Sequence, residues 1–172
     1  HAAPLSLAGA GPAVDFYFDA GFWGGAPAFT VVGDNIRFDG IGLSAFTPGG
    51  TSGGSDSQSI NALPGQAALV AVARAGFDFG GGYSAKLGFS GSYALQGSGL
   101  VAAAHGADLY AGNFGSGVFG GTSLLASLFA DASSATPGSG VLDDDAIALT
   151  GLADAGQALA LVDLFTLADV FM

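Results

Sequence analysis

The sequence predicts a mostly β protein with antiparallel sheets, and three observations support this. The chain of 172 residues contains no Glu and only three Lys and Arg residues, so the side chains that favour exposed helices are scarce. It contains 31 Gly residues, six Pro and no Cys. Several segments alternate apolar and polar residues with a period of two. We expect an antiparallel β-sandwich, with a jelly-roll-like or barrel-like arrangement as the alternative.

The first third of the chain predicts a strand, a hairpin and a loop, in that order. The alternating apolar residues of the first strand are Val14, Phe16 and Phe18. Residues 28–32 and 35–46 then predict a hairpin with a short Gly-Asp turn. Residues 48–59 are rich in Gly, Ser and Thr, so we expect an exposed loop there.

The middle of the chain predicts four strands in two hairpins. Residues 83–96 alternate apolar and polar positions throughout, and residues 69–79 do the same on a shorter scale. Three consecutive glycines separate these segments, so we expect a long antiparallel hairpin. Residues 99–104 and 108–114 predict two further strands that meet at a turn.

Two later segments have apolar residues at three- and four-residue steps, which is the spacing of a helix. In residues 123–130 the spacing predicts one short helix. In residues 157–172 it favours a helix and a strand equally, because the segment lacks the Glu and Lys of a helical polar face. The residues that set these spacings are Leu124, Leu125, Leu128 and Phe129 in the first segment, and Leu161, Leu164, Phe165, Ala168 and Phe171 in the second.

The length fits one domain with a single core. We expect residues 14–172 to form a β-rich domain and residues 1–13 to form a flexible arm, because glycines precede the first strand. The first four residues, His-Ala-Ala-Pro, include the small side chains of a chain start left by removal of a signal peptide, and the stub of a purification tag is an equal alternative. We therefore expect a protein exported to the cell surface or the extracellular space, which the lack of Cys also permits.

The charge of the chain restricts its partners. The formal net charge is −11, whereas a phosphate-binding face needs clustered cations, so we expect no nucleic acid partner. No run of 18 apolar residues occurs, so we expect no transmembrane helix.

The densest charge cluster is Asp143, Asp144 and Asp145. Adjacent carboxylates repel one another unless water or a cation lies between them. Calcium accepts carboxylate oxygens from loops, so these residues are candidate calcium ligands. The alternative is a solvated loop that precedes a strand at residues 146–150, and we expect no required cofactor.

The two histidines, His1 and His105, suggest a copper site. An N-terminal His binds copper through its amine and ring nitrogen, a second His completes the site, and Tyr17 or Tyr110 would lie axially. This pair resembles the histidine brace of copper-dependent polysaccharide monooxygenases, which implies oxygen chemistry. The alternative is an ordinary chain end and a loop histidine, and on that interpretation the protein is not an enzyme.

The composition favours a structural role. Half of the chain is hydrophobic and 10% is charged, which predicts an apolar exterior that needs a partner. We expect a self-associating subunit of an extracellular filament, sheath or matrix, in which the arm and the first strand complete a neighbour's sheet. The residues assigned to this contact are Leu5, Leu7, Val14, Phe16 and Phe18. The alternative is a secreted monomeric module that binds a glycan, calcium or a surface.

Overall fold

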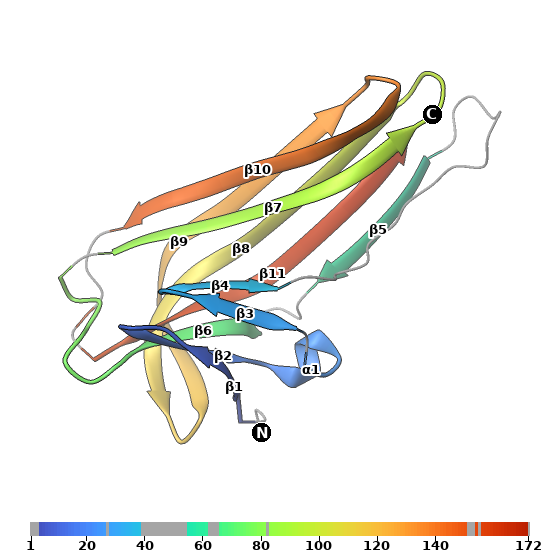
Figure 1. Ribbon diagram of the computed structural model, residues 1–172. Coiled ribbons are helices and arrows are strands. Elements are labelled where there is room, and N and C mark those ends of the chain that lie inside the picture. The colour runs from blue at the N-terminus through green and yellow to red at the C-terminus, as the bar shows by residue number, and fades with distance from the viewer. Residues whose placement is uncertain are drawn as a thin grey trace.

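The computed structural model describes residues 4–26, 28–38, 55–61, 66–81, 83–150, 154 and 156–171. Over these residues the chain forms antiparallel strands and one short helix (Figure 1). The strands are β1 (Ser6–Ala10), β2 (Val14–Phe18), β3 (Phe29–Val32), β4 (Asn35–Phe38), β5 (Ser55–Asn61), β6 (Ala67–Ala73), β7 (Tyr83–Leu95), β8 (Leu100–Gly115), β9 (Val118–Ser134), β10 (Gly138–Thr150) and β11 (Ala158–Phe171), and the helix is α1 (Ala20–Trp23). The predicted antiparallel β fold is confirmed.

The main sheet has the strand order β1-β2-β6-β11-β8-β9. Strand β11 is its centre. One edge of β11 pairs with β8, and the other edge pairs first with β6 and then with β5. The change of partner coincides with a bulge at Asp163, whose φ of 53° is the left-handed conformation. The Asp163 backbone N–H donates to the carbonyl of Gln66, which ties the bulge to the start of β6.

The bulge at Asp163 reverses the direction of the side chains along β11. Two residues an odd number of positions apart lie on opposite faces of a regular strand. Leu159 and Leu164 are five positions apart, yet both belong to one buried cluster. The extra residue therefore exchanges the two faces of β11 at its midpoint.

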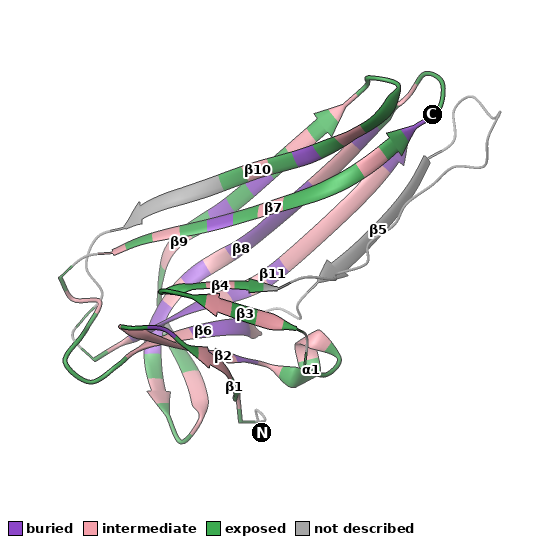
Figure 2. Cartoon of the chain, in the orientation of Figure 1, coloured by how far each residue is buried: buried purple, intermediate pink, exposed green. Residues whose placement is uncertain are grey.

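A second layer, formed by β7 and β10, covers one face of the main sheet (Figure 1). The two strands pair in register from Leu95 and Gly138 to Tyr83 and Thr150. Between the layers lies most of the core, which includes Leu87, Leu109, Leu128, Leu159 and Leu164 towards one end and Leu95, Val101, Leu142 and Val170 towards the other. Figure 2 shows buried residues along β6, β8 and β11, whereas β7 and the part of β10 whose burial is described are mostly exposed.

The opposite face of the main sheet curls at one end into a half-barrel. The Leu5 N–H donates to the Gly117 carbonyl at 2.7 Å, which brings the chain before β1 to the turn between β8 and β9. The rings of Tyr17 and Phe114 lie 4.6 Å apart across the curl. Inside it, Val70 and Val162 belong to a second buried cluster.

The first strand and the first hairpin are confirmed over the described residues. Strand β2 spans Val14–Phe18, and β3 and β4 pair as a hairpin. Residues 39–46 of that expected hairpin lie outside the described residues. The expected loop at 48–59 is wrong in part, because β5 begins at Ser55 and pairs along β11. Residues 48–54 lie outside the described part of the chain.

The expected helix at residues 123–130 is wrong, because this segment lies within strand β9. The register between β8 and β9 shifts between Leu109 and Tyr110, and Leu125 is the additional residue. The bulge places Leu125 and Leu128 against the same core cluster, three positions apart. The C-terminal segment is a strand for the same reason: the bulge at Asp163 lets Leu161 and Leu164 contact that cluster. In both segments a bulge produces the spacing of a helix.

The hairpin expected from residues 69–79 and 83–96 is also wrong. Strand β6 pairs with β2 and β11, whereas β7 pairs with β10. The glycine-rich connection carries the chain from the main sheet to the covering layer, so the two strands belong to different layers. The turn expected between residues 99–104 and 108–114 is absent as well, because both segments lie in the continuous strand β8.

Candidate assembly surface

The three adjacent aspartates lie within strand β10, not in the expected loop. Side chains alternate along a strand, so Asp143 and Asp145 lie about 7 Å apart on one face and Asp144 lies on the other. The Lys86 Nζ is 2.7 Å from a carboxylate oxygen of Asp145. The Asp144 carboxylate accepts a hydrogen bond from the Asp131 N–H of β9 at 2.9 Å. The fold therefore separates the three candidate calcium ligands, and Asp144 links β10 to the main sheet.

His105 is a buried residue of β8 with 4% of its surface exposed. Its Nδ1 lies 3.0 Å from the carbonyl oxygen of Phe165 and 2.7 Å from the hydroxyl of Thr166. Because a carbonyl only accepts, Nδ1 carries the hydrogen. Burial lowers the pKa of His105 below its ordinary value of 6.5, and the hydrogen bond to Phe165 opposes this shift. The expected loop position of His105 is wrong.

Of the two candidate copper ligands, only His105 is placed by the structure, because His1 lies outside the described residues. Tyr110 packs in the cluster under the curl, on the face of β8 opposite to His105. Among the described residues, no three His, Cys, Asp or Glu side chains form a group that could hold a metal ion.

The residues assigned to a donor strand are placed inside the subunit's own sheet. Leu7 belongs to β1, which pairs with β2 of the same chain. Val14, Phe16 and Phe18 belong to β2, which has partners on both edges, and the two Phe side chains are buried. Part of the arm expected over residues 1–13 is thus an edge strand of the domain. Leu5 precedes it and packs against the cluster under the curl.

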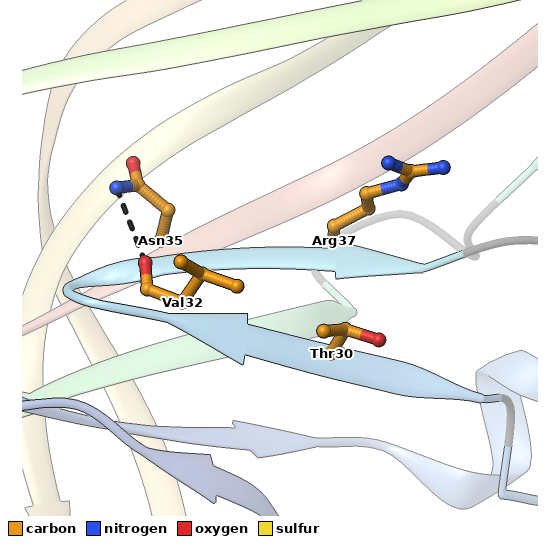
Figure 3. A pocket seen from close by; sticks show the side chains of 4 residues that line it. All are labelled: Thr30, Val32, Asn35 and Arg37. Atoms are coloured by element: carbon orange, nitrogen blue, oxygen red, sulfur yellow. Dashed lines mark hydrogen bonds between the residues drawn. The ribbon is translucent and has the colours of Figure 1, made fainter.

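A shallow hollow of about 380 Å³ lies on the hairpin of β3 and β4 (Figure 3). Thr30, Val32, Asn35 and Arg37 line it. The Asn35 side-chain amide donates to the Val32 carbonyl at 3.5 Å, at the limit of a hydrogen bond. These four side chains contain no carboxylate, histidine or nucleophile pair, so they supply no constellation for acid–base or covalent chemistry.

On the face of the main sheet opposite to β7 and β10, the part beyond the bulge at Asp163 is an apolar surface that no described segment covers. Register places Phe129 of β9 and Phe165 of β11 on either side of Gly106, with their ring centroids 6.0 Å apart. Phe129 is 57% exposed, and Phe171 is 44% exposed. We call this surface the open face, and its apolar residues are Leu100, Ala102, Ala104, Phe129, Phe165, Leu167 and Phe171.

Carboxylates lie among and beside the apolar residues of the open face. Asp131 is directly opposite Ala104, and Asp169 is directly opposite Ala102, so both share this face. Asp108, where the open face meets the curl, accepts a hydrogen bond of 2.6 Å from the Ser127 hydroxyl. The open face therefore combines exposed phenyl rings with negative charge.

Sequence reasoning missed Phe129 and Phe165 as surface residues, because bulges obscure the alternation that would place them. Comparison of the chain with protein-family models, with curated proteins and with solved structures finds no match. Within the described residues, no helix is long and apolar enough to cross a membrane.

Proposed function

We propose that this protein is a structural subunit of an extracellular filament, sheath or matrix, and that it associates with copies of itself through the open face. The observation that carries the proposal is the exposure of Phe129 and Phe171 on one sheet face that no described segment covers. Removing a phenyl side chain from water contributes about 1.5–3 kcal/mol. On this proposal the protein is not an enzyme and requires no cofactor.

The negative charge of the chain makes association between two copies dependent on salt. Asp131 and Asp169 of two subunits would approach each other at an open-face contact, and the net charge of −11 adds a wider repulsion. Salt screens such charges, with a Debye length of about 8 Å at physiological ionic strength. Association should therefore strengthen as salt or calcium is added. A neutral partner surface would not show this dependence.

The proposal is tested by sedimentation of Phe129→Ser and of Phe77→Ser as a matched control. Phe77 is 58% exposed but lies outside the open face, in the connection between β6 and β7. We expect Phe129→Ser to weaken association about tenfold or more, which corresponds to about 1.4 kcal/mol. Phe77→Ser should associate like the wild type. Equal behaviour of the two variants would contradict the proposed contact.

A secreted monomeric module that coats an interface is the second candidate function, and the same exposed rings favour it. Apolar patches on monomers mark contacts with membranes, ligands or proteins. The two functions differ in the state of the free protein. A wild-type chain that remains monomeric at millimolar concentration in high salt, but adsorbs to an oil–water interface only with Phe129 intact, would favour the monomeric module.

A further inference from the structure

Strand β7 has a long edge that pairs with no described strand. Over Tyr83–Leu95 it pairs with β10 on one side, and among the described residues it has no backbone partner on the other. An edge strand presents alternate N–H and C=O groups that can pair with another chain. A two-stranded sheet is also the smallest possible sheet, and additional strands stabilise it.

The β7 edge has few of the features that usually prevent strand addition. It contains no Pro, no carboxylate and one charge, Lys86, which already contacts Asp145. Its outward side chains are small, so a second strand could approach without a steric clash. The other outward residues of β7 are Ser84, Gly88, Ser90, Ser92 and Ala94. Natural edges are commonly blocked by Lys, Pro or bulges, and β7 pairs with β10 without a bulge.

The distribution of charge points to a second copy of β7 as the partner. The nearest outward carboxylates, Asp143 and Asp145, lie on β10, one strand away from the free edge. When two β7 edges meet, the β10 strands of the two copies are three strand spacings apart, or about 14 Å. This exceeds the Debye length of about 8 Å, so the repulsion is largely screened.

We infer that β7 pairs antiparallel with β7 of a second subunit across a two-fold axis, which forms a continuous four-stranded sheet in the order β10-β7-β7-β10. This inference rests on the proposed function and deepens it. A single two-fold contact closes into a dimer. A subunit with two different two-fold contacts, one at the open face and one at β7, extends into an open chain when the two axes do not intersect, whereas intersecting axes close it into a dihedral oligomer. The pair of surfaces thus accounts for a filament.

Cysteine scanning tests the β7 contact directly, because the chain has no Cys of its own. Single Cys substitutions at Ser84, Lys86, Ser90, Ser92 and Ala94 are assembled and treated with a short bifunctional maleimide. The control is Ser139→Cys on the same outward face of β10, directly opposite Ala94. If the two-fold axis lies between two scanned positions, an equimolar mixture of the two corresponding variants should cross-link and so locate the axis.

An antiparallel two-fold contact predicts cross-linked dimers at one β7 position or one mixed pair, with a decline on either side and none at Ser139→Cys. Equal cross-linking at every β7 position would indicate parallel stacking and overturn the inference. No cross-linking in an assembled wild-type background would overturn it too, while leaving the open-face contact intact. A wild type that never assembles overturns both this inference and the proposed function.

A charge variant gives a second, independent test. Asp introduced at the cross-linking β7 position places two carboxylates close to the axis, whereas Ser139→Asp places them one strand further from it on each side. With unchanged circular dichroism, the β7 variant should stop at dimers joined by the open face, and Ser139→Asp should still form long assemblies. Long assemblies from both variants would overturn the inference.

Discussion

The two halves of one sheet face differ in how they are covered. In the half under the curl, Val162 and Tyr110 lie on β11 and β8, and Tyr17 and the chain before β1 close over them. In the other half, Phe165 and Leu167 continue the same face of β11 without an equivalent cover among the described residues. Both halves contain aromatic and aliphatic side chains, so the presence of such side chains does not decide which half is buried.

The difference follows from the path of the chain at Asp163. On one side of the bulge β11 pairs with β6, which leads through β2 and β1 into the curl. On the other side it pairs with β5, and the sheet continues no further among the described strands. The chain thus supplies its own cover for one half. The exposed rings of the other half are the surface that we assign to a neighbouring subunit.

Deletion of Asp163 should have the largest effect on this arrangement. Without the extra residue, Leu164 and Val170 would turn towards the open face, and Phe165 would turn into the core. Because Leu164 is 1% exposed, we expect loss of cooperative unfolding, measured by circular dichroism during heating. The control is Asp163→Gly, which keeps the residue count and suits a φ of 53°, and should lie within about 1 kcal/mol of wild type. A normal transition in the deletion variant would contradict the assigned bulge.

Shortening one side chain on each side of the bulge should have different effects on stability and on self-association, because only one of the two halves is covered within the subunit. Val162→Ala removes methyl groups from a buried site and leaves a cavity, so we expect a loss of about 1–3 kcal/mol in the free energy of unfolding. Leu167→Ala removes a larger group from the half-buried open face, and we expect a loss below about 1 kcal/mol but weaker self-association. Urea unfolding and sedimentation measure the two effects. A greater stability loss for Leu167→Ala would show that the open face is covered within the subunit.

The sequence predicts where individual strands lie better than it predicts which face of each strand is buried. Strand β2 and the hairpin of β3 and β4 follow from alternation and a turn, which act between neighbouring residues. The pairing of β7 with β10 joins segments more than forty residues apart, and nothing local distinguishes it from a hairpin with β6. The bulges at Leu125 and Asp163 change which side chains point into the core, and they give the inward-pointing residues the three-residue spacing of a helix. The open face depends on those bulges, so alternation could not reveal it.

Protonation of His105 should have the smallest effect on the free energy of unfolding. His105 lies on the face of the main sheet that β7 and β10 cover, so its protonation reports how tightly these two strands cover the sheet. Burial lowers the pKa of His105 in the folded protein, so below pH 6.5 the unfolded chain binds a proton more readily than the folded one. Folded stability should therefore decrease as the pH falls from about 6.5 towards the folded pKa, by at most about 1.4 kcal/mol per pH unit. From about pH 7.5 upwards the imidazole is largely neutral in both states, so this residue should contribute little pH dependence.

Urea unfolding of wild type and His105→Asn at several pH values isolates that contribution. Asn retains a donor near the Phe165 carbonyl but does not titrate, so the difference in stability between the two proteins should change between pH 7.5 and pH 5. Contributions that are common to both proteins cancel in this difference. A constant difference across the range would mean that water reaches His105 and that β7 and β10 cover this part of the sheet less tightly than their packing indicates. In that case water would reach both faces of the main sheet beyond the bulge at Asp163. Exposure would then no longer distinguish the open face as the contact with a neighbouring subunit.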